Sequence, residues 1–268
     1  MANHSVAIAF ATVFVLPFIF ILLTAMMSRT QALAGSLWPH PLKLDNFVRV
    51  FRYVPLWQYT WNTVVYAVLS TFGTVASSIP VAYALSRMRW RGRQAAFVLV
   101  LSTLMLPPQV TIVPLYVIFV RIGWIGSLKP LIVPAFFGDA FTIFLLRQFF
   151  MTIPEELSEA ARVDGASELQ ILTRVIMPLA KPAIAAVALF QFLYCWNDFF
   201  GPLLYTGSNP HIWTLAVGLS QFSSVLHQGV LWNIQMAASI LFMLPVIALF
   251  FVAQRAFIEG VTLTGVKG

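Results

Sequence analysis

Two carboxylates stand among apolar residues, and they are the side chains best placed to do chemistry in this sequence. They are Asp139 and Asp198, the second within Trp196-Asn197-Asp198-Phe199. A charge in apolar surroundings needs a partner or water, because burying it unpaired is costly. Aromatic rings beside an amide and a carboxylate suit a sugar, whose faces stack on rings and whose hydroxyl groups need fixed hydrogen-bond partners.

These carboxylates allow more than one interpretation. In one, Trp196, Asn197, Asp198 and Asp139 line the path of a substrate. In another, Asp198 belongs to a polar network that holds its helix against neighbouring helices. Asp139 fits a helix end near the outer membrane surface as well as it fits a buried position. A proton relay is a third possibility, although no histidine accompanies either carboxylate within an apolar segment.

Familiar catalytic and metal sites need residues that the sequence lacks. A Walker-type phosphate loop requires Gly-Lys-Ser/Thr, and none of the four lysines follows a glycine. No HExxH sequence occurs, and the single cysteine, Cys195, excludes an internal disulfide and a cysteine-rich metal site. We therefore predict no catalytic residue, no metal site and no cofactor bound by this chain. A partner must supply any ATP hydrolysis.

A polar segment, residues 155–178, separates two long apolar stretches and predicts two short helices. Thr152 and Glu155 have the spacing of a capping box, with Pro154 in the first turn, so a helix is expected to begin there. Its pair of alanines lets another backbone approach closely. Leu157, Ala160, Ala161 and Asp164 are expected to share one face of this helix.

The second helix of this segment is expected to follow a glycine turn. Gly165 ends the first helix or turns the chain, and Ser167 with Gln170 has the spacing of another capping box. Pro178 is expected to stop this helix. Its predicted apolar side carries Leu169, Leu172, Val175 and Ile176.

The composition identifies an integral membrane protein. Of the 268 residues, 60% are apolar and 9% are charged, against about 25% charged in a soluble domain. The net charge of +7 comes from basic residues spread between apolar blocks. This distribution indicates orientation in a membrane and excludes nucleic acid as a partner.

The hydropathy pattern predicts an all-α protein with six transmembrane helices, since about 20 apolar residues cross the hydrocarbon core. The predicted spans are Val6–Met27, Thr63–Leu85, Ala95–Val120, Leu131–Phe150, Pro182–Leu204 and Val230–Phe257. Small residues at helical spacing in the second span (Ser70, Gly73, Ser77, Ala84) suit close helix contacts.

Two predicted spans are interrupted. The third contains Pro107, Pro108 and Pro114, which are expected to kink or end it. The fourth contains Asp139. Interrupted helices are tolerated against protein or a water-filled cavity, so both are expected near the interior of the bundle.

The loop charges predict the orientation. The sequence RMRWRGR at 87–93 lies between two spans and favours the cytoplasm. This choice puts both termini and the 151–181 loop on the cytoplasmic side of the cell (inner) membrane, although the first outer loop is itself basic.

Several motifs in the expected order resemble one family. The sequence IPEELSEAARVDGAS at 153–167 resembles the EAA signature of the permeases of binding-protein-dependent ABC importers. LLRQFF at 145–150, MPLAKPA at 177–183, WNDFFGPLL at 196–204 and AYALSR at 82–87 agree with it. The resemblance covers nearly the whole chain and indicates the carbohydrate-uptake branch, specifically the shorter permease of the maltose-transporter type.

The resemblance implies a single permease domain, residues 1–268, with a cytoplasmic coupling loop at 151–181. It implies that the loop sits in a groove of a cytoplasmic ATPase. The implied partners are a second, homologous permease forming a heterodimer, two ATPase subunits that bind ATP and Mg, an extracellular or periplasmic substrate-binding protein, and membrane lipid. The residues implied to make or support the ATPase joint are Glu159, Ala160, Ala161, Asp164, Gly165, Ile176 and Pro178.

The expected function is to form half of the path for a sugar or sugar-like solute. An importer of glycerophosphodiesters or glycerol phosphate is the alternative with the same architecture. A self-sufficient secondary transporter would need an internal repeat or a coupling cluster of carboxylates, and the sequence shows neither. A membrane-embedded enzyme would need a convergent catalytic set, which is also missing.

Overall fold

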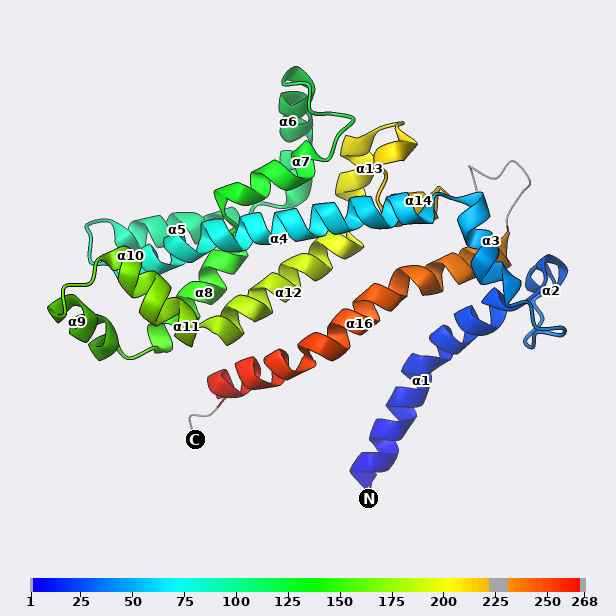
Figure 1. The fold of residues 1–268 in the computed structure, drawn as a ribbon, viewed down its shortest axis with the longest axis horizontal. Coiled ribbons are helices and arrows are strands. Elements are labelled where there is room, and N and C mark those ends of the chain that lie inside the picture. The colour runs from blue at the N-terminus through cyan, green and yellow to red at the C-terminus, as the bar shows by residue number, and fades with distance from the viewer. Residues whose placement is uncertain (1, 222–230, 266–268) are drawn as a thin grey trace. The chain divides into compact units, whose positions relative to one another are not determined.

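The computed structural model describes residues 2–221 and 231–265, which form helices and loops with no strand (Figure 1). The chain divides into two compact units. One comprises residues 1–62 and 213–251, and the other comprises residues 63–212 and 252–268. We describe each unit by itself.

The first unit is held together around the end of its first helix. Its elements are α1 (Ala2–Ala25), α2 (Arg29–Leu33), α3 (Asp45–Tyr53), the start of α4 (Leu56–Ser86), α14 (Leu215–Ser220) and the first part of α16 (Trp232–Gly265). The buried side chain of Asn46 in α3 donates hydrogen bonds to the carbonyls of Ala25 and Met27, both at 2.8 Å. Asn233 in α16 donates to the Met27 carbonyl at 3.2 Å. These amides satisfy carbonyls at and just beyond the end of α1 that have no partner within the helix.

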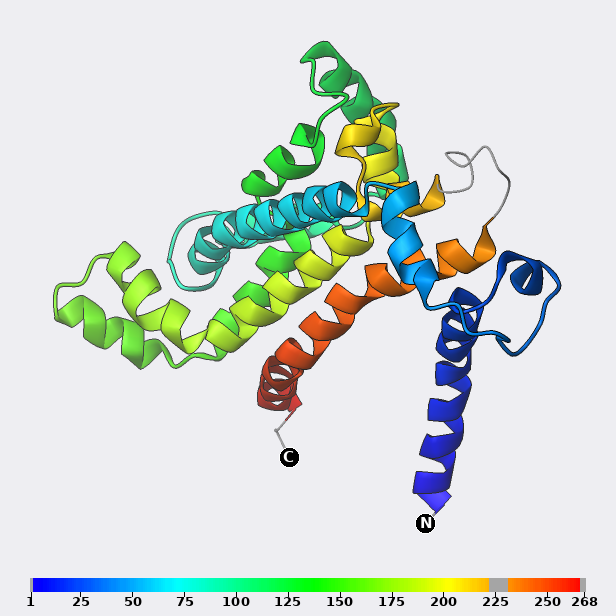
Figure 2. The same cartoon turned by 45° about the vertical axis from the view of Figure 1, so that its right-hand side comes forward.

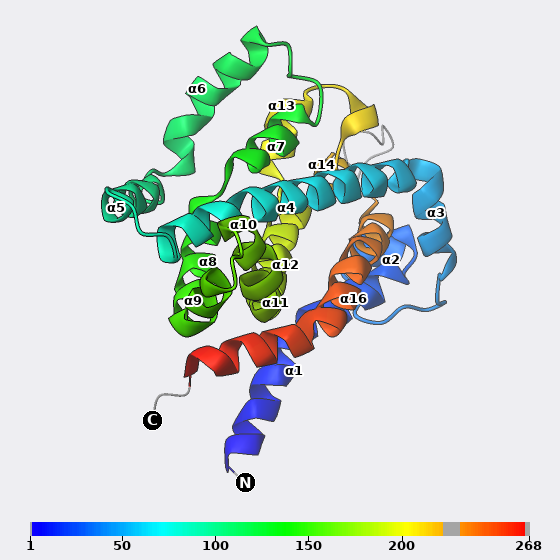
Figure 3. The same ribbon diagram turned by 60° about the vertical axis from the view of Figure 1, so that its left-hand side comes forward.

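The second unit is built around α4. It contains α5 (Arg93–Thr103), α6 (Pro108–Arg121), α7 (Lys129–Ile132) with a 3₁₀ turn (Val133–Phe137), α8 (Ala140–Thr152), α9 (Glu155–Val163), α10 (Glu168–Ile171), a π-helical turn (Leu172–Ile176), α11 (Met177–Leu179), α12 (Lys181–Asn197), α13 (Phe200–Thr206) and a 3₁₀ turn (Pro210–Ile212). Helix α8 packs against α5 and α12, and α13 packs against α7. Helices α9, α10 and α11 gather near the C-terminal end of α4 (Figures 1 and 3).

The small residues of α4 make the predicted close contacts. Gly73 lies directly against the ring of Phe136. The hydroxyl of Ser70 donates to the Leu131 carbonyl at 3.0 Å, and the hydroxyl of Ser77 donates to the Ala135 carbonyl at 3.2 Å. The chain after α7 therefore follows α4 at backbone distance, as the spacing of small residues predicts.

Four of the described helical segments are long and apolar enough to cross a membrane. They are Val6–Ala25, Leu56–Ser86, Lys129–Thr152 and Trp232–Phe251. A fifth span results if Glu168–Leu179 and Lys181–Asn197, which meet at an 80° bend, are counted as one. The all-α membrane fold is confirmed, while a count of six is not reached by the described helices.

The difference from six has identifiable causes. The predicted span at 95–120 is divided between α5 and α6 by a break ending at Pro107, as its prolines predict. The predicted span at 182–204 is interrupted where α12 ends at Asn197, and α13 begins at Phe200.

The two interrupted segments differ in burial. Within this chain, α8 buries a full face, whose residues are Thr142, Ile143, Leu146, Arg147 and Phe150. Helix α6 instead stands away from α4 (Figure 2) and leaves Val110, Val113 and Ile118 exposed. The expected interior position is thus correct for α8 and wrong for α6 within this chain.

Candidate functional site

The polar loop between α8 and α12 folds as two short helices joined at a glycine, as predicted. Helix α9 ends at Val163, and Gly165 follows with φ +82°. A side chain at this backbone angle is strained, so glycine suits the turn. Ser167 accepts a hydrogen bond from the backbone N–H of Gln170, whose side chain accepts from the Ser167 N–H at 2.8 Å. The second capping box is confirmed.

The first helix of the loop begins where it is predicted, but its predicted cap is wrong, and the second helix ends one residue beyond its predicted stop. Thr152 belongs to the end of α8, where its hydroxyl donates to the Phe149 carbonyl at 2.8 Å. Pro154 therefore precedes α9 with no side-chain cap. Pro178 does not stop the second helix, because the π-helical turn before it adds a residue and the helix continues to Leu179. A wider turn accommodates a proline that lacks an N–H.

The loop presents an exposed surface of small and apolar groups. Val163 is 87% exposed, Leu169 69% and Leu157 43%. Among the residues predicted for the ATPase joint, Glu159, Ala160, Asp164, Gly165 and Pro178 are exposed, Ala161 is half-buried and Ile176 is buried. Large apolar side chains exposed around a small-residue helix are typical of a protein interaction surface.

A hydrogen-bonded triad ties this surface to α4. The hydroxyl of Tyr83 donates to Glu168 at 2.5 Å, and the Arg162 guanidinium donates to the same carboxylate at 2.8 Å. The hydrogen bond from Arg162, then that from Tyr83, holds the pKa of Glu168 below its usual range. At the other end of the loop, Arg89 pairs with Glu155 at 2.8 Å and lowers the pKa of that carboxyl.

Two arginines join the C-terminal ends of α4 and α8 reciprocally. Arg87, directly after α4, donates to the carbonyls of Phe150 and Ile153 at the end of α8. Arg147 of α8 donates to the Leu85 carbonyl of α4 at 3.0 Å. Each arginine thus donates to carbonyls at the C-terminal end of the other helix, where few intrahelical donors remain, and its charge is favourable at a helix C-terminus. We call this pair of contacts the arginine clasp.

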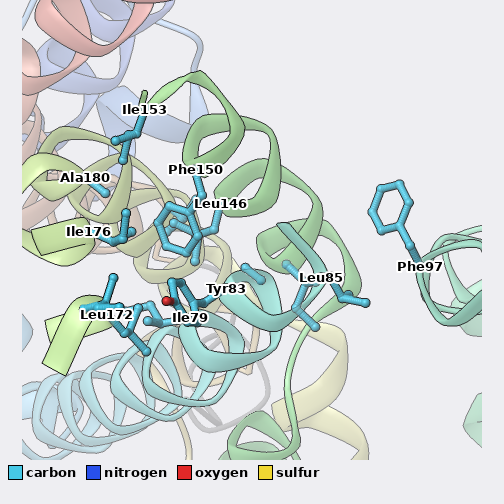
Figure 4. Close-up of a cluster of buried hydrophobic side chains, with 14 residues drawn as sticks. Ile79, Tyr83, Leu85, Phe97, Leu146, Phe150, Ile153, Leu172, Ile176 and Ala180 are labelled. Carbon is cyan, nitrogen blue, oxygen red and sulfur yellow. The ribbon is translucent and has the colours of Figure 1, made fainter. Parts of the chain in front are cut away.

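Next to the arginine clasp, an apolar cluster packs the loop against the membrane helices α4 and α8 (Figure 4). Leu146 and Phe150 of α8 face Ile79 of α4, and Leu172 and Ile176 of the loop complete the cluster. All five side chains are buried. The loop therefore shares a core with α4 and α8, and its exposed face is the outer side of this packed unit.

Sequence reasoning did not anticipate the clasp. It assigned Arg87 to the basic segment that sets orientation and gave Arg147 no structural role. A usable signal existed: an arginine at or near the C-terminal end of an apolar helix needs carbonyls or carboxylates nearby.

The candidate substrate-path residues do not converge on one point. Trp196 is 2% exposed and stacks on Phe192 with ring centroids 5.6 Å apart. Asn197 is exposed and donates back to the Leu193 carbonyl at 2.8 Å. Asp198 is half-buried, and it accepts hydrogen bonds from the Tyr66 hydroxyl at 2.8 Å and from the Gly201 N–H of α13 at 3.1 Å. Both oxygens of Asp198 thus join α12 to α4 and α13.

Asp139 is the N-cap of α8. Its Oδ2 accepts from the Thr142 N–H at 2.7 Å, and its own N–H donates to Ser78 at 3.2 Å. It also lines a cavity of about 500 Å³ between α8 and α12. Among the described residues, no group of three or more His, Cys, Asp or Glu side chains could hold a metal ion.

The fold and the loop together define a multi-pass, all-α membrane protein with an exposed, partly apolar surface on the loop between α8 and α12. The chain belongs to the family of binding-protein-dependent transport system inner membrane components, whose model matches residues 62–262. It is therefore a permease subunit of an ABC importer, a transport subunit and not an enzyme. Such permeases work with a partner permease, an ATPase and a binding protein.

Known proteins resemble the chain over nearly its whole length. The arabinooligosaccharides transport system permease protein of Halalkalibacterium halodurans is 33% identical over 97% of this chain and 93% of its own. The sn-glycerol-3-phosphate transport system permease protein of Escherichia coli is 30% identical over 96% and 94%. A solved bacterial ABC transporter involved in the import of the acidic polysaccharide alginate has a chain with TM-score 0.83 and 27% identity, covering 95% of this chain and 94% of its own.

Proposed function

We propose that this chain forms half of the translocation pathway for a sugar or sugar-like solute, beside a second, homologous permease. An extracellular or periplasmic binding protein delivers the solute, and two cytoplasmic ATPase subunits, which bind ATP and Mg, drive the cycle. The chain acts as one permease domain, residues 1–268, with its termini in the cytoplasm. The basic segment at 87–93 supports this orientation.

The joint with the ATPase is the exposed face of the 151–181 loop. One observation carries this proposal: a small and apolar surface, with Val163 87% exposed, is fixed to α4 and α8 by buried contacts. A groove on an ATPase subunit would cover this surface. ATP-driven closure of the ATPases would then move α4 and α8 with the loop, since bistable packing transmits such motions as rigid-body shifts.

Substitution of Gly165 tests the joint. Gly165→Asp places a charged side chain on the exposed turn, and we expect it to abolish transport and ATPase binding while membrane insertion is retained. Gly126→Asp is a matched control, because Gly126 also has φ +82° and open space around it. Uptake and co-purification of the ATPase are measured in cells producing the whole transporter. Normal uptake by the Gly165→Asp transporter would disprove the docking assignment.

The relatives that bear on the substrate class are named for different substrates. The arabinooligosaccharide relative favours a neutral sugar, and the glycerol-3-phosphate relative supports the alternative substrate class. A panel of sugars and glycerophosphodiesters, applied to the cognate binding protein, separates them. Binding of glycerophosphodiesters without binding of sugars would reject the neutral sugar.

A further inference from the structure

Helix α3 of the first unit lies where three membrane spans begin or end. The span in α1 ends at Ala25, the span in α4 begins at Leu56, and the span in α16 begins at Trp232. The side chain of Asn46 in α3 donates to the Ala25 carbonyl at 2.8 Å and accepts from the Asn233 side chain at 3.2 Å. Only two residues separate α3 from α4. Helix α3 therefore lies at the boundary between the hydrocarbon core and water.

Helix α3 runs across the start of α4 and does not continue its direction (Figures 1 and 3). The chain changes direction at Val54, whose backbone is extended, and at Pro55, which has no N–H to donate. A helix that crosses a spanning helix at its end runs along the membrane surface, as interfacial helices do.

The exposed face of α3 is apolar. Leu44, Val48 and Phe51 are spaced four and three residues apart on this face, and each is more than half exposed. Asn46 and Val50, on the other side, are buried. An apolar face that the chain itself leaves uncovered needs another apolar phase to cover it.

Exposed tryptophans mark the same boundary. Trp57 and Trp61 lie in the first two turns of α4, and Trp232 is the first residue of α16. Tryptophan is enriched where the membrane meets water, because its ring is apolar and its N–H is polar. These side chains support a position of α3 at the level of the lipid headgroups.

The segment that carries α3 is basic. Residues 26–62 contain four arginine or lysine residues and one acidic residue, Asp45. The side chains of Lys43 and Arg52 are exposed, and neither makes a hydrogen bond or ion pair with the residues that the structure describes. This charge opposes the orientation that the basic segment at 87–93 favours. It indicates a local anionic partner instead.

We propose that α3 is an interfacial anchor that binds anionic phospholipid. Leu44, Val48 and Phe51 enter the boundary between headgroups and acyl chains, and Lys43 and Arg52 contact lipid phosphate groups. The surface adjoins the α1 span, none of which is buried within this chain, so lipid already surrounds it. In the proposed orientation this lipid belongs to the outer leaflet. The anchor goes beyond the proposed function and does not depend on the substrate.

The test places a fluorophore on α3 of the complete transporter in phospholipid nanodiscs. Val48→Cys in a Cys195→Ala chain, assembled with cysteine-free partner subunits, carries the label. Nitroxide-bearing phosphatidylglycerol should quench it more strongly than nitroxide-bearing phosphatidylcholine. Lys43→Gln and Arg52→Gln should each lower this preference about fivefold, and added salt should also lower it. Arg121→Gln, which changes an exposed arginine at the end of α6, is the matched control and should leave it unchanged.

The same label reports its depth. Iodide in the water should quench the fluorophore at position 48 weakly, and it should quench a label on Ser208→Cys, in an exposed polar loop, strongly. Equal quenching by the two lipids, or strong quenching of position 48 by iodide, would overturn the proposal. Loss of lipid quenching when the substrate-binding protein is added would also overturn it, because the surface would then belong to that protein.

Discussion

Replacing Arg87 with alanine should release the coupling loop from the membrane helices. Arg87 is 8% exposed, and its guanidinium donates to the carbonyls of Phe150 and Ile153. Burial lowers the pKa of Arg87, but arginine remains protonated in proteins. The Arg87→Ala change therefore removes a buried charge from a helix C-terminus, takes the arginine donor from the Ile153 carbonyl and leaves the Phe150 carbonyl with the Ile153 N–H alone.

The size of the effect follows from the hydrogen bonds lost. Hydrogen bonds from a charged donor contribute about 1.5–3 kcal/mol each, so losing the bonds to two carbonyls costs about 3 kcal/mol or more. Every 1.4 kcal/mol is tenfold in an equilibrium. We therefore expect the open form of the loop to become about 100-fold more populated than in the wild-type protein.

Hydrogen exchange of the backbone amides in residues 150–165, measured on the purified transporter, reports this opening directly. Arg91→Ala is the matched control, since Arg91 is an exposed arginine of the same basic segment. Arg87→Lys keeps the charge without the forked geometry and should exchange at an intermediate rate. Exchange in Arg87→Ala within about threefold of Arg91→Ala would refute the clasp as the main anchor.

The remaining predictions concern other contacts of the second unit. Ser167→Ala removes an N-cap and should lower the free energy of unfolding by about 1 kcal/mol, measured by thermal denaturation of the purified protein; no change would count against the capping box. The ion pair of Glu168 with Arg162 lowers the pKa of Glu168, so it stabilises the loop above the ordinary carboxyl pKa and loses this effect as pH falls through the lowered value. A spin label on the loop should therefore become mobile below about pH 4. Equal mobility at pH 7 and pH 3 would contradict this. Gly73→Val drives two methyl groups into the Phe136 ring and should reduce the folded protein in membranes, whereas Gly73→Ala at wild-type level would show that the ring yields easily.

The sequence predicts local structure well where one residue type decides the geometry. Gly165 ends α9 because few other residues adopt φ +82°. The Ser167 capping box forms because both of its hydrogen bonds are local. Pro107 lies at the break between α5 and α6 for the same reason, since a proline acts on its own turn.

The sequence predicts side-chain contacts poorly where a residue far away in the sequence determines them. Glu155 has the spacing to cap its own helix, yet Arg89 from another segment takes its carboxylate. Trp196 and Asp198 are neighbours in a motif, but packing buries the first and pairs the second with Tyr66. Gln191 and Tyr194 belong to no motif, yet both line the cavity between α8 and α12.

The arginine clasp also constrains how this chain can change over time. Arg87 donates to carbonyls at the end of α8 and Arg147 donates to a carbonyl of α4, so each helix end depends on a side-chain donor from the other segment. A mutation that removes one arginine cannot be compensated within the same helix. Among relatives of this chain, the two positions should accordingly be inherited as a unit, and lineages that lose one arginine should replace the other or reshape the helix end that it served.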